Sequence, residues 1–228
     1  MLRLIHDDAD LVAIDKPAGL LVHPTRLDAH EQLSALRLLE QQLGVRLFPL
    51  HRLDKGTGGV LLFARTADAA RHWGAAFMDG TVEKRYRALV RGWPDASGHI
   101  DYALARDPEL PSEGQARLEA VTEFRRLASF EWPFSVDGRH TSSRYALVEV
   151  NPRSGRRHQI RRHFKHIGHP LVGDATHGKG AHNRAVAAWL GLQRLWLHAT
   201  SLSLPGGPCI EAPCGAEWDR LAARNQAA

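Results

Sequence analysis

The sequence predicts an α+β fold with a mixed, mostly antiparallel sheet and flanking helices. Three segments between residues 121 and 150 have strand character, and no helical pattern separates them. Successive strands without intervening helices favour antiparallel pairing. Two earlier segments, 31–43 and 68–78, place apolar residues at helical spacing. The 228 residues are enough to bury a sizeable core, and we expect a single domain over 1–228.

Composition and charge are those of a soluble globular protein. Hydrophobic residues make up 43% of the chain, and no stretch approaches the roughly 20 apolar residues of a membrane-spanning helix. The first eight residues lack a signal-peptide pattern, so we expect a cytoplasmic protein. The net charge of +5 is compatible with a nucleic-acid partner but does not require one. Cys209 and Cys214 have no second pair, which disfavours a zinc ribbon, so they are structural or incidental.

The N-terminal part of the chain predicts a hairpin, a turn and a helix. Residues 2–6 and 11–15 are apolar pieces around an acidic turn, which is typical of a hairpin. The turn Lys16–Gly19 then breaks the chain, and Leu20–Pro24 forms a second short apolar piece. The helix over 31–43 is followed by a glycine, a common C-terminal stop.

The stretch His51–Gly59 concentrates charge and glycine between two apolar runs. Asp54 lies between the cations Arg52 and Lys55, and three glycines follow within five positions. The next run, Val60–Ala64, has the character of a buried strand. The stretch therefore predicts a tight loop that presents Asp54 at the mouth of a strand. A charged turn without a chemical role is the alternative.

The segment Val82–Gly92 alternates with the period of a strand. Lys84, Tyr86, Ala88 and Val90 fall on one face, and arginines occupy the other. An aromatic residue on such a face most often belongs to the core.

The rest of the chain predicts loops, strands and a short final helix. Residues 93–120 have little periodicity and predict a loop region with a short strand piece, Ile100–Leu104. The three later strands are expected at Val121–Leu127, Phe130–Val136 and Ser143–Val150. We expect Leu202–Gly207 to close the sheet and Glu217–Arg224 to form the final helix.

The segment 153–169 holds six arginine or lysine side chains and four histidines but no acidic residue. After a turn at residues 152–155, we expect residues 155–164 to open a helix. This helix would place His158, Arg161 and Arg162 on one face, with Arg157 joining Arg161. Such a face has three interpretations: solvated charge, a grip on phosphates, or the pairing of one arginine with a buried carboxylate.

No metal or cofactor is expected. The sequence has no His-Glu-x-x-His pattern, and no carboxylate lies among residues 153–173 beside the clustered histidines. We expect these histidines to cap, to form hydrogen bonds or to touch phosphate. No glycine-rich dinucleotide loop and no P-loop is present.

Several motifs together resemble the RluA-type pseudouridine synthases. His51–Gly59 resembles the HRLD-x-x-T-S-G signature of that family, with Gly58 in place of serine, which we expect to change the stiffness of the loop rather than its chemistry. Residues 84–88 resemble the motif K-x-Y-x-A. Residues 155–163 match every fixed position of G-R-x-H-Q-L/I-R-x-H, and 166–174 resemble the segment that follows it.

The resemblance implies an isomerase with a central RNA-binding cleft, which detaches uracil from ribose and rejoins it through carbon. Asp54 would be the nucleophile, and Tyr86 would stack on the target base. Arg161 would contact Asp54 and keep it ionised, because a guanidinium opposes the rise in pKa that burial causes. Arg52 would help to displace the target nucleotide from its helix. The other expected RNA-binding residues are Lys55, Arg156, Arg157, His158 and Arg162.

Two later segments, 174–178 and 191–199, resemble a branch of the family that modifies uridine 65 of certain tRNAs. We therefore expect tRNA as the partner of a monomeric enzyme that lacks the small S4-like N-terminal RNA-binding domain of some members. A ribosomal RNA substrate, a non-catalytic RNA-binding protein on the same fold, and a hydrolase that pairs Asp54 with a histidine are the alternatives.

Overall fold

A computed structural model of the chain describes residues 1–23 and 33–223. Contacts within the chain divide it into two compact units. The first comprises Met1–Lys84 and His198–Pro213, and the second comprises Arg85–Leu197 and the residues from Cys214 onward. None of the described helices is long and apolar enough to cross a membrane.

The sheet of the first unit is built around β4 (Gly58–Ala64), in which all residues are buried. Strand β4 pairs antiparallel with β2 (Leu11–Lys16) and with the short β3 (Phe48–Pro49). It pairs in parallel with β11 (Leu197–Ser203). Strand β2 also pairs with β1 (Leu4–Asp7), which confirms the predicted hairpin. The buried strand expected after the Asp54 loop is confirmed too.

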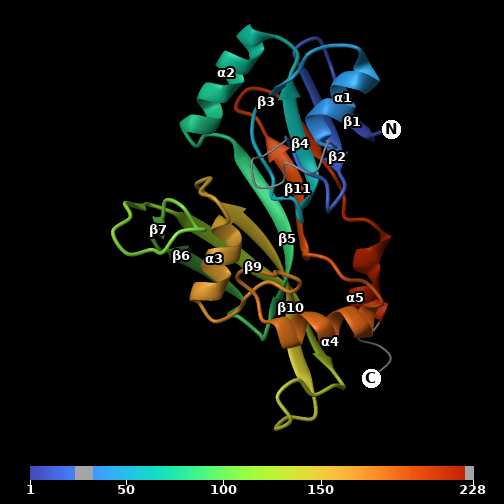
Figure 1. Ribbon diagram of the computed structural model, residues 1–228, viewed down its shortest axis with the longest axis vertical. Helices are drawn as coiled ribbons and strands as arrows, with labels where there is room; N and C mark the ends of the chain where they lie inside the picture. Colours follow the sequence, from blue (N-terminus) through green and yellow to red (C-terminus); the bar gives the residue numbers. More distant parts are fainter. Residues whose placement is uncertain (24–32, 224–228) are drawn as a thin grey trace. The chain divides into compact units, whose positions relative to one another are not determined.

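Two helices flank this sheet (Figure 1). Helix α1 (Ala35–Leu43) begins after Ser34, whose hydroxyl accepts a hydrogen bond from the first turn, and ends at Gly44 in a left-handed conformation, as predicted. It starts later than expected, although the first two residues of the predicted range lie outside the described part. Helix α2 (Ala67–Met78) begins after the cap Thr66, one residue before its predicted start.

The end of the first unit differs from the sequence prediction. The expectation that Leu202–Gly207 closes the sheet holds only for Leu202 and Ser203, because β11 ends at Ser203 and a turn follows. The chain then returns as β12 (Cys209–Glu211), which pairs antiparallel with β11. The turn forms where Pro205 and two glycines interrupt the strand pattern.

The second unit contains four antiparallel strands in the order β5–β10–β9–β6. Their bounds are Glu83–Arg91, Ser143–Pro152, Val121–Trp132 and Ser97–Asp101, respectively, and the first two residues of β5 are counted in the first unit. With the antiparallel pairs of the first unit and the flanking helices, they confirm the predicted α+β class.

Two expected strands, Val121–Leu127 and Phe130–Val136, are in fact the single strand β9. The intervening Ala128 and Ser129 interrupt the apolar pattern but not the backbone ladder with β10. The register shifts once: Leu147 is aligned with Ala128 and Val148 with Arg126, so Leu127 of β9 is left out of the pairing. The strand stops at Trp132, directly before a proline that cannot donate a ladder hydrogen bond.

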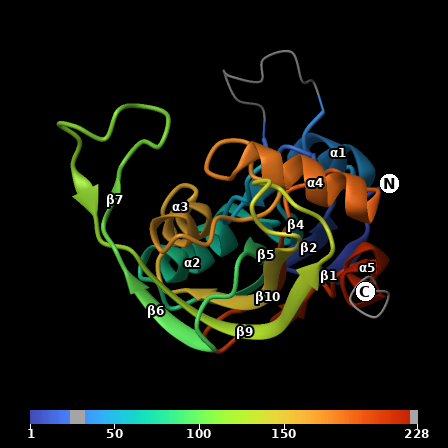
Figure 2. The same ribbon diagram turned by 90° about the horizontal axis from the view of Figure 1, so that it is seen from below.

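An arm extends from the second unit between β7 (Leu104–Ala105) and β8 (Arg117–Leu118), which pair with each other (Figure 2). We define the arm as residues 106–116. The Gln115 side chain accepts the Asp107 N–H at 2.7 Å and donates to backbone oxygens of the arm, so the arm carries its own internal bonds.

The remaining helices begin within or after the basic segment, which we define as residues 153–169. Helix α3 covers Gln159–His166, and α4 covers Gly180–Leu190. A short 3-10 turn, Ala216–Trp218, leads into α5, Asp219–Ala223. The final helix is therefore present near its predicted place, and the predicted end at Arg224 lies outside the described residues.

His51 fixes the start of the Asp54 loop to the sheet of the first unit. The Leu62 N–H of β4 donates to His51 Nε2 at 3.1 Å, and the imidazole stacks on Phe77 of α2 with ring centroids 5.2 Å apart. Burial lowers the pKa of His51 to about 3, the charge of Lys84 adds to this effect, and a hydrogen bond to the Arg52 backbone opposes it. The imidazole is therefore neutral near pH 7.

We expect the pH dependence of stability to report on His51. Below pH 6.5 the unfolded chain binds a proton at this residue, whereas the folded protein does so only near pH 3. The free energy of unfolding should therefore fall as the pH drops below 6.5, by up to about 1.4 kcal/mol per pH unit from this group. The variant His51→Gln retains a hydrogen-bond acceptor without titrating, so urea unfolding should show a weaker dependence. Equal slopes in both proteins would contradict the assignment.

Gly59 should be irreplaceable for a steric reason. It has a φ of +103°, and an added Cβ would overlap the backbone of Ala199 on the parallel neighbour β11. We expect Gly59→Ala to lower the free energy of unfolding by more than about 2 kcal/mol. The matched control Gly74→Ala, in α2 with open space around it, should raise stability by about 0.5–1 kcal/mol. Urea unfolding of both variants tests the contrast.

Candidate functional site

The Asp54 loop is the tight turn that the sequence predicts. The Thr57 N–H donates to the Asp54 carbonyl at 2.9 Å, which closes the turn. Leu53 is buried, Asp54 is half-buried, and the flanking cations Arg52 and Lys55 are exposed. The loop therefore holds its backbone against the core while the residues of the two cations are exposed at the surface.

Gly58 allows the backbone to pass closely between two neighbours. An added Cβ would lie 3.0 Å from His198 Nδ1 and 3.3 Å from the Lys16 carbonyl oxygen. These distances are tight, so a serine here would require its neighbours to shift by a few tenths of an ångström. The departure from the family signature thus concerns packing at the start of β4, which is consistent with the expected effect on stiffness.

Strand β5 carries Lys84 and Tyr86. Both side chains are half-buried, while Glu83, Arg85 and Arg87 are exposed, so the predicted alternation is confirmed in this part of the strand. Burial lowers the pKa of Lys84, which belongs to the first unit.

Tyr86 belongs to the second unit, where its side chain packs against the core around Ala88 and Val90 while remaining partly exposed. The ring is neither fully buried nor free of the core. Its packing alone is therefore compatible with a core residue and with a residue that stacks on a base.

Arg161 forms a buried bidentate ion pair with Asp174. Arg161 Nε lies 2.7 Å from Asp174 Oδ2, and Nη2 lies 2.8 Å from Oδ1. The same carboxylate accepts the N–H groups of Thr176 and His177, each at 2.9 Å. Burial by itself would raise the pKa of Asp174, but the hydrogen bonds and charge of Arg161 and the two N–H groups lower it overall. Pairing with a buried carboxylate is therefore confirmed for this arginine.

The beginning of α3 differs from the prediction. The helix starts at Gln159, and His158 precedes it with a φ of +55°, the only positive value at a non-glycine position among the described residues. The sequence predicted that Arg157 and His158 share a helical face with Arg161 and Arg162. This prediction is wrong, because Arg157 and His158 lie before the helix.

The side chain of Gln159 explains the late start of the helix. Gln159 Oε1 accepts the Arg156 N–H at 2.9 Å and the Ser154 hydroxyl at 2.8 Å. Its amide donates to the Val121 carbonyl at 2.9 Å and to Thr122 Oγ1 at 3.0 Å. These contacts hold the residues before the helix as a turn against β9.

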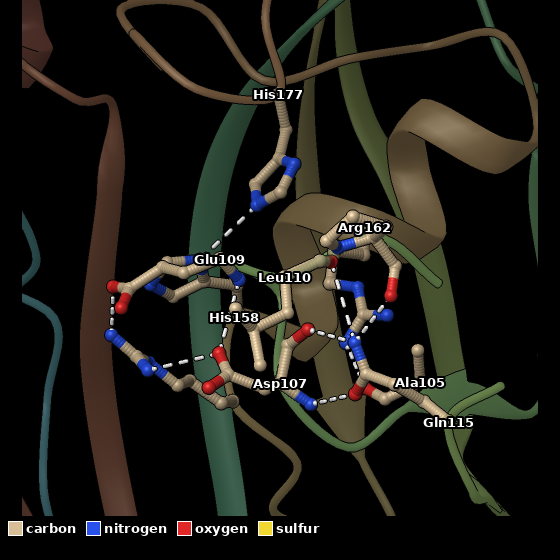
Figure 3. A network of polar contacts seen from close by, with 10 residues as sticks. Ala105, Asp107, Glu109, Leu110, Gln115, His158, Arg162 and His177 are labelled. Carbon is tan, nitrogen blue, oxygen red and sulfur yellow. Dashed lines mark hydrogen bonds and ion pairs between the residues drawn. The ribbon is translucent and has the colours of Figure 1, made fainter. Parts of the chain in front are cut away.

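The arm is attached to the basic segment by a network of polar contacts (Figure 3). Arg157 pairs with Glu109 and, through Nη1 at 3.4 Å, with Asp107. Arg162 donates to the Ala105 carbonyl at 2.9 Å. Burial, chiefly, and the nearby charge of Arg117 lower the pKa of Arg162. Arg157 and Arg162, which we expected to bind RNA, thus make contacts within the second unit.

Two other expected RNA-binding residues have different surroundings. Arg156 is exposed, and its Nε donates to the Glu119 carbonyl at 3.0 Å. His158 Nδ1 lies 3.1 Å from His177 Nε2. Both residues are labelled in Figure 3. Burial lowers the pKa of His177, and the nearby Asp174 opposes that effect.

The other histidines of this segment mainly hold the fold together. His163 bonds Thr122 Oγ1 at 2.9 Å and the Tyr102 carbonyl at 3.0 Å. His169 Nδ1 bonds the Arg91 carbonyl at 2.8 Å. Hydrogen bonding, one of the three roles expected for these histidines, is therefore confirmed. Within the described part of the chain, no group of three or more His, Cys, Asp or Glu side chains is arranged to hold a metal ion.

The predicted site residues are divided between the units. The Asp54 loop belongs to the first, and Tyr86 and Arg161 belong to the second. The contact of Arg161 with Asp54 stays a prediction. Sequence reasoning assigned no role to His51 or Asp174, although both lie in the quoted motifs, because only their partners in the fold show what they hold.

Comparisons with known proteins agree with the motifs. The RNA pseudouridylate synthase family matches residues 10–166. A tRNA pseudouridine synthase C of Vibrio cholerae is 42% identical over 207 residues, which cover 89% of this chain and 84% of that protein. The protein of the same name from Yersinia pestis is 40% identical over 225 residues, or 96% and 87% of the two chains.

Solved structures show the same fold. Human RNA pseudouridylate synthase domain containing 4 matches with a TM-score of 0.74 at 26% identity, over 98% of this chain and 93% of that one. Human RNA pseudouridylate synthase domain containing 1 matches with a TM-score of 0.75 at 23% identity, over 99% and 87%. The chain therefore belongs to the RNA pseudouridylate synthase family, as the resemblance of its motifs predicted.

Proposed function

We propose that this RNA pseudouridylate synthase isomerises uridine in tRNA and that Asp54 is its nucleophile. The relatives named tRNA pseudouridine synthase C support the choice of RNA, since they are at least 40% identical over most of both chains. The observation that carries the choice of residue is the Asp54 turn. It holds a carboxylate between two exposed cations, at the start of a buried strand.

Arg161 and Tyr86 complete the proposed constellation. The bidentate bond to Asp174 fixes the guanidinium plane of Arg161, so its remaining donor atoms have a defined direction. A guanidinium next to Asp54 would keep that carboxylate ionised and therefore nucleophilic. The half-buried ring of Tyr86 would stack on the uracil, a contact worth on the order of 1–3 kcal/mol. We propose that residues 1–228 act as one catalytic domain that binds RNA.

The exposed cations would bind the RNA backbone. Arg52 and Lys55 flank Asp54, so they would meet the phosphates around the target nucleotide, and Arg52 would stabilise the extruded state. Of Arg156, Arg157 and His158, only Arg156 is exposed. Arg157, His158 and Arg162 would bind RNA only by exchanging contacts that they make within the second unit.

Position 65 of tRNA is the site that we propose, on the likeness to one branch of the family. Mapping of modified positions in tRNA from a deletion strain distinguishes it from other sites and from ribosomal RNA. We further propose a cytoplasmic monomer. The isomerisation is redox-neutral and transfers no phosphoryl group, so we expect no metal or cofactor to take part.

The first activity prediction concerns Asp54. The substitution Asp54→Asn preserves size and removes the anionic nucleophile, so pseudouridine formation should fall by about a thousandfold or more. Binding of tRNA should change by less than about threefold, because backbone phosphates supply most of the affinity. Tritium release from uridine labelled at C5, with mass spectrometry of the product, measures the rate. Formation of pseudouridine at the wild-type rate would remove Asp54 from the mechanism.

The second activity prediction concerns the planar guanidinium group of Arg161. Arg161→Lys keeps the positive charge but cannot make two parallel bonds to Asp174. The maximal rate should therefore fall by about 10- to 100-fold, because the cation is no longer oriented. Arg71→Lys, on the exposed surface of α2, is the control and should leave the rate unchanged. Equal rates for the wild type and Arg161→Lys would show that charge alone suffices.

A further inference from the structure

We propose that two carboxylates of the arm, those of Asp107 and Glu109, compete with RNA phosphates for Arg157, an inference that rests on the proposed RNA-binding role of this arginine. The arm contains three acidic residues and one arginine, whereas the basic segment contains no acidic residue. The carboxylates that pair with Arg157 therefore come from residues 48 and 50 positions earlier in the chain. Both lie in the second unit with Arg157, and both are labelled in Figure 3.

The ion pairs of Arg157 match its guanidinium incompletely. Nη2 donates to Glu109, but Nη1 lies 3.4 Å from Asp107 Oδ1, which is long for a charge-assisted hydrogen bond. Arg157 Nε is buried and has no hydrogen-bond partner among the described residues. An unmatched buried donor is unfavourable. Arg157 is therefore held less well than Arg161, whose Nε and Nη2 both bond Asp174.

The ion pairs of Arg157 are also accessible to solvent. The side chains of Arg157, Asp107 and Glu109 are 31%, 39% and 42% exposed, respectively. Partly exposed ion pairs are weak, because water and salt screen both charges. A phosphate can offer the same guanidinium two oxygens, and a tRNA brings many phosphates at once. Exchange of the carboxylates for a phosphate is therefore feasible at this arginine.

The arm can release these contacts without exposing an apolar core. Residues 109–114 are exposed, and the pairing of β7 with β8 anchors the arm at its base. Gln115 bonds both the N–H and the carbonyl of Asp107, so the arm has internal bonds that do not involve Arg157. Segments with few buried apolar contacts open at a low cost in free energy. Displacement of the carboxylates is therefore a local change and not an unfolding of the second unit.

The competition has consequences for both binding and release. Asp107 and Glu109 engage Arg157 before RNA arrives, and their negative charges repel phosphates. When RNA leaves, the same carboxylates take Arg157 back, so they favour dissociation. The arm thus lowers the affinity for RNA, and an enzyme that must release a modified RNA gains in turnover from a weaker grip.

The decisive variant combines Asp107→Asn with Glu109→Gln, which removes both negative charges at nearly constant size. Asparagine keeps a side-chain oxygen for the N–H of residue 109, which Asp107 Oδ1 accepts at 3.0 Å. We expect the dissociation constant for in vitro transcribed tRNA to fall about 3- to 10-fold, mainly through slower dissociation. A plot of log affinity against log salt should steepen by about 0.7–0.9, because Arg157 then neutralises one phosphate without first losing a carboxylate.

Two single variants give a matched comparison. Glu109→Gln and Glu113→Gln each remove one charge from an exposed residue of the arm, but the described ion pairs of Arg157 include only Glu109. Glu113→Gln should change the dissociation constant by less than about 1.5-fold, and Glu109→Gln should lower it at least about twofold. Equal effects of the two would indicate general charge repulsion and overturn the proposal, as would an unchanged or raised dissociation constant in the combined variant.

Arg157→Gln, made in the wild type and in the combined variant, tests whether the carboxylates act through this arginine. The two proteins that carry Arg157→Gln should bind tRNA alike, within about twofold. The substitution should therefore cost about 3- to 10-fold more affinity in the combined variant than in the wild type. Equal losses in both would overturn the competition but leave Arg157 as an RNA-binding residue. No loss in either would refute the proposed role of Arg157, and the competition would fail with it.

Pseudouridine formation in the same tRNA is measured separately. If the wild-type protein binds this tRNA but makes no pseudouridine in it, the proposed substrate fails. The competition is then still decided by the dissociation constants, because it concerns the binding of phosphate and not the isomerisation.

Discussion

A buried strand can present a charged loop only if the buried backbone groups around the loop are largely hydrogen-bonded. Strand β4 imposes this constraint on the first unit, because it is buried along its whole length and the Asp54 loop leads directly into it. His51 satisfies the Leu62 N–H at one end of the loop, and Lys16 and Gly19 bind the Lys55 carbonyl at the other. The geometry of Asp54 therefore depends on residues that never need to touch the substrate.

In the second unit, the buried charged group that needs hydrogen-bond partners is the guanidinium of Arg161. Arg161 is buried, and a buried guanidinium is tolerated only when its donors are matched, which the bidentate bond to Asp174 achieves. Asp174 in turn fixes the backbone of the next turn through two N–H groups. This arrangement makes Arg161 a rigid donor rather than a mobile surface charge.

The positive charge of the basic segment is divided between structure and surface. Arg157 is engaged by two carboxylates of the arm, and Arg162 is bound to a carbonyl, whereas Arg156 and the loop residues Arg52 and Lys55 are exposed. As a member of its family the chain is an isomerase that makes pseudouridine from uridine in RNA, and such an enzyme must hold a polyanion without immobilising it. Exposed arginines and lysines give the salt-dependent part of that affinity, while ion-paired residues set the shape of the surface.

Local patterns in the sequence determined the elements whose signals are local. The stop of α1 at Gly44, the alternation of β5, the N-terminal hairpin and the tight Asp54 loop all follow from periodicity, capping and turn chemistry over a few residues. The family was also evident, because its motifs combine residue types that rarely occur together by chance.

Only the tertiary structure decided which partners the charged and polar side chains take. The unbroken course of β9 depends on its pairing with β10, and the late start of α3 depends on a glutamine that binds β9. Residue periodicity in the sequence likewise does not reveal the bond of Lys16 to a carbonyl 39 residues away or the pairing of Arg161 with Asp174. Hydrogen bonds and ion pairs act between groups that folding brings together, so their partners are set by the path of the chain through space, whereas periodicity records only which face of an element is buried.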